Sequence, residues 1–205
     1  MFRAPLLATY RSSLSMGNLE NGGISGGIAG HASSSGSIPG RYAALHRGTP
    51  PFGVAVRVLL YTLSGEEKEI AYHPSGKPYL ADDSASLSIS HTKGYVAVVL
   101  GLPGREVGVD IEQYGERVRK VAHKFMREDE QPSVFRGTDT WSLLLHWSAK
   151  ETMFKCLNAS EVDFRGHMRI LPFAVNESGV SPPKNIVRWR NAGSLFIIIC
   201  FRILS

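Results

Sequence analysis

Residues 107–112 read Val-Gly-Val-Asp-Ile-Glu, a stretch in which apolar and acidic positions alternate. Alternation with a period of two is typical of a β-strand that has one apolar face and one polar face. Asp110 and Glu112 then project from the same face, about 7 Å apart along the backbone, and Gly108 leaves that face open. Two carboxylates at this spacing can bind one hard divalent cation, although a solvated polar face on an edge strand produces the same pattern.

Residues 147–155 read Trp-Ser-Ala-Lys-Glu-Thr-Met-Phe-Lys and lie within a helix that we expect over 140–157. Apolar side chains fall on most of the circumference of this helix, so it must be covered on several sides. Its charged residues are therefore not there for solubility. Glu151 and Lys155 lie one turn apart on one face. They are compatible with a simple ion pair, or with a metal held by Glu151 beside a phosphate held by Lys155.

A mixture of helices and strands is predicted from residue 54 onward. Helical periodicity indicates helices at 54–63, 118–125 and 140–157, the last one capped by Asp139 or Thr140. Apolar runs and alternation of period two indicate strands at 85–90, 95–100, 186–189 and 195–201. These patterns by themselves predict a fold that mixes helices and strands and do not give its topology. No internal sequence repeat is visible.

Residues 89–92 read Ile-Ser-His-Thr and end one of the predicted strands. A hydroxyl, an imidazole and free backbone amides at a strand end can bind a phosphate, although a Ser-His pair also commonly caps a turn. The motif does not predict a hydrolase nucleophile, because no Gly-x-Ser-x-Gly elbow surrounds Ser90.

Composition and charge exclude several classes of protein. Cys156 and Cys200 sit in separate apolar stretches, which fits neither a disulfide framework nor a zinc site and favours the cytoplasm. The longest purely apolar run, 196–201, is far shorter than the roughly 20 residues that span a bilayer. Of the net charge of +5, residues 1–53 contribute four Arg against one Glu, and the rest contributes 19 basic against 17 acidic side chains. Because the basic residues form no stripe, a nucleic-acid-binding module is disfavoured.

Residues 1–53 differ in character from the rest of the chain. From residue 12 to residue 53 the sequence is rich in Gly and Ser and has little apolar periodicity. Such a segment buries too little apolar surface to offset its backbone entropy, so we expect it to be largely disordered. Its first dozen residues only faintly resemble an organelle transit peptide, because no sustained amphipathic helix follows.

Taken together, the chain from about residue 54 resembles the 4′-phosphopantetheinyl transferase superfamily, of the two-lobed type that activates carrier domains of synthases. The resemblance rests on the order and spacing of motifs at 76–78 (Gly-Lys-Pro), 90–92, 107–112 and 147–155. It implies an α+β fold of two similar lobes, a pseudo-dimer in which each small antiparallel sheet packs on a long helix. Residues 54–106 would form the remainder of the amino-terminal lobe, and residues 107–205 the carboxy-terminal lobe with the metal site.

The resemblance also implies a set of site residues and a reaction. Mg²⁺, with Mn²⁺ as the alternative, would be held by Asp110, Glu112 and Glu151 against the pyrophosphate of coenzyme A. The nucleotide end would be contacted by Lys77, Pro78, Ser90 and His91, and a phosphate oxygen by Lys155. A serine hydroxyl of an acyl or peptidyl carrier protein would attack the β-phosphorus, and 3′,5′-adenosine bisphosphate would leave.

The base that removes the serine proton is left open by the sequence. Glu130 is one candidate, because it ends a segment, 125–130, that matches a Phe-rich segment of the family ending in Glu. A metal-bound water activated by Glu112 would serve equally, and Glu130 is also compatible with a charged helix cap.

Residues 1–53 do not resemble the amino-terminal half-lobe of the family, so we expect the first lobe to lack part of its sheet. Weaker coenzyme A binding and lower stability would follow. The competing hypothesis is a non-catalytic remnant that binds coenzyme A or a carrier protein. We expect a cytoplasmic monomer that binds neither nucleic acid nor membrane.

Overall fold

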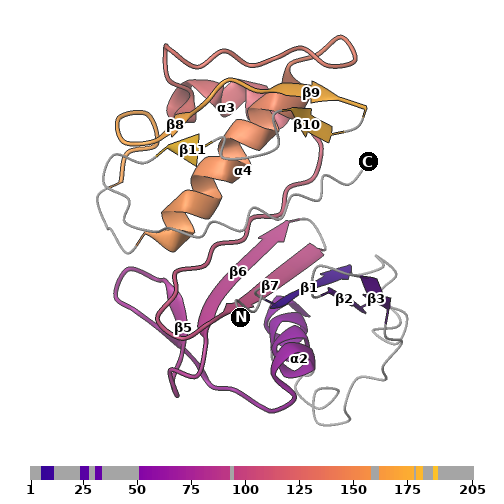
Figure 1. The fold of residues 1–205 in the computed structure, drawn as a ribbon, viewed down its shortest axis with the longest axis vertical. Helices are drawn as coiled ribbons and strands as arrows, with labels where there is room; N and C mark the ends of the chain where they lie inside the picture. Colours follow the sequence, from indigo (N-terminus) through magenta and orange to yellow (C-terminus); the bar gives the residue numbers. More distant parts are fainter. Residues whose placement is uncertain are drawn as a thin grey trace.

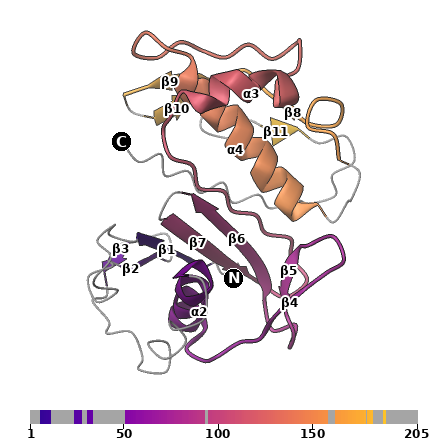
Figure 2. The same ribbon diagram turned by 180° about the vertical axis from the view of Figure 1, so that it is seen from behind.

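The computed structural model describes residues 6–11, 24–27, 31–33, 51–92, 95–157, 162–177, 179–181 and 187–188. These residues form two groups of elements, which Figures 1 and 2 show from opposite sides. One group contains a five-stranded sheet with helix α2, and the other contains helices α3 and α4 with short strands. The chain between β7 and α3 passes along the boundary of the two groups, and it carries residues 107–112.

The five-stranded sheet is antiparallel, with the order β3-β2-β1-β7-β6. Its strands are β1 (Leu6–Arg11), β2 (Ile24–Gly27), β3 (His31–Ser33), β6 (Ser86–Thr92) and β7 (Tyr95–Gly101). Strands β1, β2 and β3 lie within residues 1–53, but most of that segment lies outside the described residues, so the expectation that it is largely disordered and leaves the sheet incomplete stays a prediction. Strand β1, which precedes the Gly- and Ser-rich residues 12–53, pairs with β7 along its whole length, so its backbone hydrogen bonds are made within the sheet.

Helix α2 (Pro51–Ser64) packs against this sheet and forms the first core. Strand β7 is buried on both faces: Val96, Val98 and Leu100 join the α2 core, whereas Ala97 and Val99 pack against residues 107–111. The continuous apolar run of β7 follows from this position, because a strand covered on both sides has no polar face. A short hairpin of β4 (Ile70–Tyr72) and β5 (Pro78–Leu80) adds Leu80 to the same core.

Residues 107–112 are extended but do not form a strand, which corrects the prediction from their alternation. The side-chain hydroxyls of β6 bind this segment instead of a backbone ladder. The amide of Val109 donates to Ser88 Oγ at 3.1 Å, and that of Ile111 donates to Ser90 Oγ at 3.3 Å. The alternate residues Val107, Val109 and Ile111 do pack together against β7, but periodicity carries no information about which partner satisfies the amides.

The second group is built around α4 (Thr140–Cys156), which packs against α3 (Arg117–Phe125). Two short antiparallel pairs complete it: β8 (Arg169–Ile170) with β11 (Val187–Arg188), and β9 (Ala174–Asn176) with β10 (Gly179–Ser181). Most of α4 is buried on all sides, as the sequence predicted. Asp139 occupies the N-cap position of α4, but its side chain makes no capping hydrogen bond and instead faces Arg119 at 3.3 Å.

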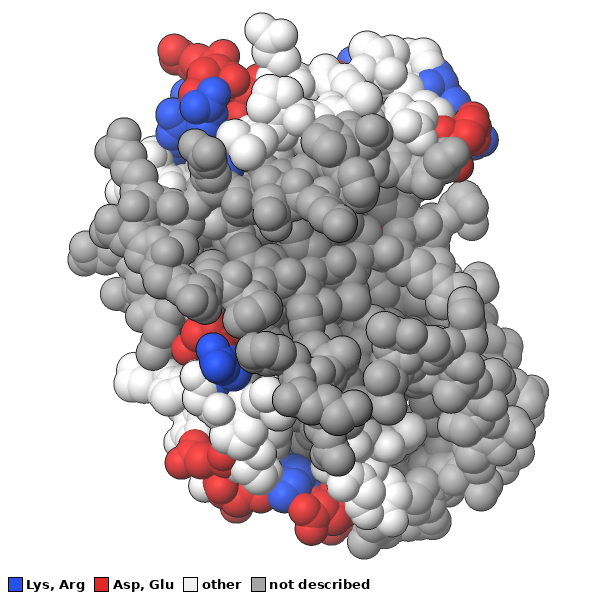
Figure 3. All heavy atoms as spheres, in the orientation of Figure 1, with Lys and Arg blue, Asp and Glu red and all other residues white. Residues whose placement is uncertain are grey.

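The helices expected at 54–63, 118–125 and 140–157 and the strands expected at 85–90 and 95–100 are confirmed. The strand expected at 186–189 corresponds to β11, and the one at 195–201 lies outside the described residues. The mixed α+β class with small antiparallel sheets is confirmed, whereas the similarity of two lobes stays a prediction. Within the described part of the chain, every helix is too short or too polar to cross a bilayer. On the face that Figure 3 shows, basic and acidic side chains of described residues lie beside one another.

Candidate functional site

Asp110 lies where the extended segment 107–112 passes between β6 and α4, and it is 4% exposed. Its Oδ1 accepts hydrogen bonds from Ser90 Oγ at 2.9 Å and from Lys155 Nζ at 2.8 Å. Its other oxygen, Oδ2, is buried and has no hydrogen-bond partner among the described residues. A buried carboxylate oxygen without a partner is costly, so Oδ2 is suited to a ligand that the protein itself does not supply.

Glu112, two residues further on, is half-buried and accepts a hydrogen bond from the indole Nε1 of Trp147 at 2.8 Å. Burial raises the pKa of the Glu112 carboxyl, and the negative charge of Asp110 raises it further. The charge of Asp110 therefore acts on the Glu112 carboxyl, whereas the binding of one cation by both residues stays a prediction.

Glu151 approaches the same region from α4 and is also half-buried. Burial raises the pKa of the Glu151 carboxyl to about 6; the positive charge of Lys155 lowers it, and the charges of Asp110 and Glu112 add to the increase. The three predicted metal ligands therefore share one electrostatic environment. Even so, no three His, Cys, Asp or Glu side chains in the described ranges converge closely enough to form a ready metal site.

Lys155 connects α4 to the acidic segment. Its ammonium donates to Asp110 Oδ1 at 2.8 Å, to the Val109 carbonyl at 3.0 Å and to Ser90 Oγ at 3.1 Å. The ion pair described for Lys155 is thus with Asp110, not with Glu151 one turn away. This arrangement places one positive charge directly beside the Asp110 carboxylate.

Gly108 allows the extended segment to approach α4 this closely. A Cβ atom at this position would lie 2.3 Å from the Thr152 carbonyl oxygen and 2.7 Å from Cys156 Sγ, both closer than real contacts. The absence of a side chain at residue 108 is therefore required by packing against α4, and not by an open polar face as the sequence suggested.

One comparison with known protein families finds a match that includes the acidic segment and α4. Residues 106–187 match the family model described as the 4′-phosphopantetheinyl transferase superfamily. These residues form a domain of that superfamily. No curated protein matches the chain significantly. Members of the superfamily transfer a phosphopantetheine group from coenzyme A to carrier proteins, which supports that general activity for this chain. Asp110, Glu112, Glu151 and Lys155 all lie within the transferase domain.

The residues predicted to contact the nucleotide end precede the transferase domain, and the structure does not bring all four together. Lys77 and Pro78 line a cavity of about 440 Å³ beside the segment that leads to residue 107. Lys77 forms an ion pair with Glu106 and donates to the Cys156 carbonyl at 3.4 Å. Ser90 and His91 are not among the residues that line this cavity.

His91 follows Ser90 on β6 but points elsewhere. It is exposed, and its ring packs against Phe52 of α2 with the ring centroids 4.3 Å apart. Ser90 is buried against Asp110. Successive residues on a strand face opposite sides, so Ser90 and His91 cannot both face the same ligand surface unless the strand twists between them.

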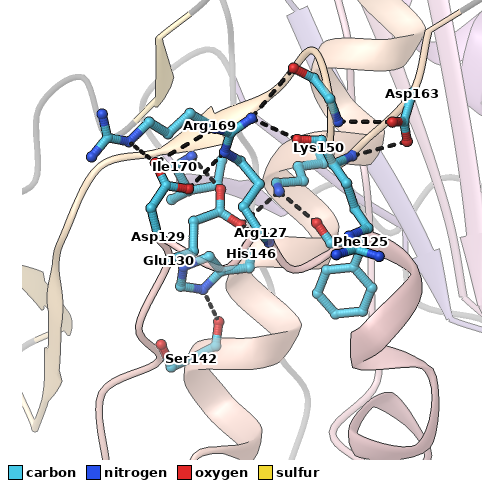
Figure 4. A network of polar contacts seen from close by, with 12 residues as sticks. Phe125, Arg127, Asp129, Glu130, Ser142, His146, Lys150, Asp163, Arg169 and Ile170 are labelled. Atoms are coloured by element: carbon cyan, nitrogen blue, oxygen red, sulfur yellow. Dashed lines mark hydrogen bonds and ion pairs between the residues drawn. The ribbon is translucent and has the colours of Figure 1, made fainter.

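Glu130 of the transferase domain is buried in a polar network, which Figure 4 shows. One carboxylate oxygen accepts hydrogen bonds from Lys150 Nζ at 2.7 Å and from the Arg127 amide at 2.9 Å, and the other accepts from the Ile170 amide at 2.6 Å. Lys150 also donates to the Phe125 carbonyl at 2.6 Å. The role of general base for Glu130 stays a prediction, and this geometry favours a structural role because both oxygens are already bonded.

Trp147 and Ser88 contact the acidic segment but were not singled out from the sequence. For Ser88 a signal was present, because Ser86, Ser88 and Ser90 occupy alternate positions of β6 and so share one face. Trp147 begins the motif at 147–155, but nothing in the sequence indicated Glu112 as its partner, since the partner of an indole N–H on a covered helix depends on the packing of distant segments.

Proposed function

We propose that this chain transfers the 4′-phosphopantetheine group of coenzyme A to a serine of an acyl or peptidyl carrier protein, in a Mg²⁺-dependent reaction. This is the reaction of a holo-acyl-carrier-protein synthase. One observation supports it best. Within a domain of the transferase superfamily, Asp110 forms an ion pair with Lys155, and the negative charge of Asp110 acts on the carboxyl groups of both Glu112 and Glu151.

The donor set has the chemistry of a Mg²⁺ or Mn²⁺ site. Carboxylate oxygens are the ligands that hard cations prefer, and Asp110 Oδ2 is a buried oxygen without a partner among the described residues. Asp110, Glu112 and Glu151 would hold the cation, with side-chain movements that draw the three carboxylates together. When bound, the cation would neutralise charge on the pyrophosphate of coenzyme A.

The side chains of this chain would bind the phosphates and manage the proton. Lys155 would neutralise charge on a phosphate oxygen as the serine oxygen bonds to the β-phosphorus and the phosphorus–oxygen bond to 3′,5′-adenosine bisphosphate breaks. To donate to that oxygen, the Lys155 ammonium would have to release one of its three hydrogen bonds to Asp110, Val109 and Ser90. Of the two candidates for the base, Glu112 acting through a water molecule fits better than Glu130. Glu112 is partly exposed, whereas the side chain of Glu130 is 0% exposed and paired with Lys150.

Several finer features belong to the same proposal. The cavity beside Lys77 and Pro78 would accept the nucleotide end of coenzyme A, because it combines a cationic side chain with the aromatic residues His73 and Tyr79. Two similar lobes, a monomeric state and a cytoplasmic location follow from the family resemblance and stay predictions.

Transfer is tested by mass spectrometry. Purified protein with coenzyme A and Mg²⁺ should add about 340 Da to a carrier protein, as expected for group transfer to one hydroxyl. Glu151→Gln should abolish the added mass, because it removes a charged oxygen ligand with little change in shape. If several carrier proteins stay unmodified while a known transferase modifies them under the same conditions, the proposal is wrong.

One observation favours a second candidate, a non-catalytic protein that binds coenzyme A or carrier protein. The three carboxylates do not form a ready metal site in the described conformation, and Lys155 is bonded to Asp110. This candidate predicts binding of carrier protein or coenzyme A without any gain in mass, which calorimetry and the transfer assay distinguish together.

A further inference from the structure

Ser90 of β6 is the point at which three parts of the candidate site meet. Its side chain is 6% exposed. Its hydroxyl donates to Asp110 Oδ1 at 2.9 Å and accepts from Lys155 Nζ at 3.1 Å and from the Ile111 amide at 3.3 Å. One hydroxyl thus contacts an acid, a cation and the backbone between the two acids of the segment 107–112.

The hydrogen-bonding capacity of this hydroxyl is fully used. A serine hydroxyl has one proton to donate and two lone pairs with which to accept. The Ser90 hydroxyl donates its one proton in the hydrogen bond to Asp110, and its two lone pairs accept from Lys155 and Ile111. No proton therefore remains for a hydrogen bond to a phosphate oxygen. Contact with the nucleotide, which the sequence resemblance implies for Ser90, would require this network to break.

The same contacts distinguish the two carboxylate oxygens of Asp110. Oδ1 accepts hydrogen bonds from both Ser90 and Lys155, whereas Oδ2 has no hydrogen-bond partner among the described residues. Fixing one oxygen of a carboxylate restrains the rotation of the whole group, so the direction of the other is set as well. Groups that orient a ligand in this way contribute strongly to metal affinity.

We propose that Ser90 is a positioning residue, which holds Asp110 and Lys155 so that the free Asp110 oxygen faces the bound cation. This inference rests on the proposed function. It assigns to Ser90 a role that differs from contact with the nucleotide, and it predicts that loss of the hydroxyl weakens cation binding more than coenzyme A binding.

Ser88 provides a matched control on the same strand. It is 3% exposed and accepts the Val109 amide at 3.1 Å, just as Ser90 accepts the Ile111 amide. Among the described contacts, Ser88 reaches neither Asp110 nor Lys155. A role confined to holding the backbone therefore predicts similar effects for the two serines, whereas a positioning role predicts an effect on cation binding for Ser90 alone.

The test measures Mn²⁺ affinity of the full chain by isothermal titration calorimetry, together with kcat, the KM for coenzyme A and the melting temperature. Ser90→Ala should lower Mn²⁺ affinity by about 10- to 100-fold, while Ser88→Ala leaves it close to that of the wild type. Both variants should lose thermal stability, and Ser90→Ala should lose more, because Ser90 makes three of the described hydrogen bonds and Ser88 makes one. Ser90→Thr keeps the hydroxyl and should recover most of the affinity. If Ser90→Ala does not fold, Ser90→Cys takes its place in the test. Its thiol has a size close to that of the hydroxyl but is a weaker hydrogen-bond donor and acceptor.

Equal Mn²⁺ affinities of the Ser90→Ala and Ser88→Ala variants would overturn the inference. So would a raised KM for coenzyme A in Ser90→Ala with unchanged Mn²⁺ affinity, because that result points to nucleotide contact. Failure of the wild type to bind Mn²⁺ or to transfer the group would instead defeat the proposed function, and the inference with it.

Discussion

At the scale of single residues, the buried ion pair of Glu130 and Lys150 is the least replaceable charge pair described in this chain. Both side chains are 0% exposed, and their remaining hydrogen-bonding groups reach the backbone at Phe125, Arg127 and Ile170. Two charges removed from water are tolerated when each is paired and hydrogen-bonded, as here. Lys150 directly precedes Glu151 in α4, so this pair also fixes the helix that carries a proposed metal ligand.

Glu130→Gln should therefore lower the free energy of unfolding by about 3–5 kcal/mol, because it leaves the Lys150 ammonium buried without an opposite charge. Chemical unfolding monitored by circular dichroism measures this change. Asp129→Asn is the control, since the exposed pair of Asp129 with Arg127 should contribute far less. A Glu130→Gln variant with the stability of the wild type but no transfer activity would contradict the structural role and restore Glu130 as the general base.

At the scale of elements, the site depends on how closely the extended segment 107–112 lies against α4. Asp110 and Glu112 belong to that segment, and Glu151 and Lys155 belong to the helix. The close approach depends on Gly108, which contacts the α4 backbone at Thr152. A small change in the spacing between the segment and α4 would therefore change the distances from Glu151 to both Asp110 and Glu112.

Gly108→Ala should push the segment away from α4. We expect a loss of about 1–3 kcal/mol in the free energy of unfolding, typical of overpacking at a tight contact, together with a marked fall in transfer activity. Gly115→Ala is the matched control, because a Cβ there meets nothing nearer than the Gln113 carbonyl oxygen at 4.0 Å. Thermal unfolding and the mass assay check both variants. If Gly108→Ala is as stable and active as Gly115→Ala, the packing argument is wrong.

At the scale of the whole molecule, stability should depend on pH through a buried histidine of α4. His146 is 2% exposed, and its Nδ1 lies 2.8 Å from the Ser142 carbonyl, to which it donates. Burial lowers the pKa of His146 below its ordinary value of 6.5, although the Ser142 carbonyl and the charge of Glu130 oppose this and the charge of Lys150 adds to it. The folded protein therefore keeps His146 neutral at a pH where the unfolded chain takes up a proton.

The sign of the effect follows from this difference. Because the unfolded state binds the extra proton, stability that is present above pH 6.5 is lost as the pH falls below 6.5 toward the folded pKa. The loss is at most about 1.4 kcal/mol per pH unit for one group. His146→Asn keeps a donor for Ser142 but cannot titrate, so its stability should change less between about pH 7.5 and pH 5.5. Parallel slopes for wild type and variant, measured by urea unfolding, would contradict this prediction.

The sequence by itself determined the local elements and the chemical types of the site. Helices α2, α3 and α4 and strands β6 and β7 were predicted, because their apolar residues repeat with the period of the structure they form. The acids of 107–112 and of α4 were identified as one group through the order and spacing of motifs, and the matched family domain includes both stretches. The strands β1, β2 and β3 within residues 1–53 were not predicted, because β1 pairs with β7, β2 with β1 and β3 with β2, and such pairing leaves no local pattern in the sequence.

Only the tertiary structure decided which partner each polar group has. Lys155 pairs with Asp110, 45 residues away, and not with Glu151 one turn along the helix. Ser90 bonds to Asp110 20 residues further on, and Glu130 is enclosed by Lys150 and Ile170. Periodicity gives the direction of a side chain from its own helix or strand, but its partner depends on how distant segments pack. For that reason the ligand set could be proposed from the sequence, whereas the positioning role of Ser90 and the burial of Glu130 could not.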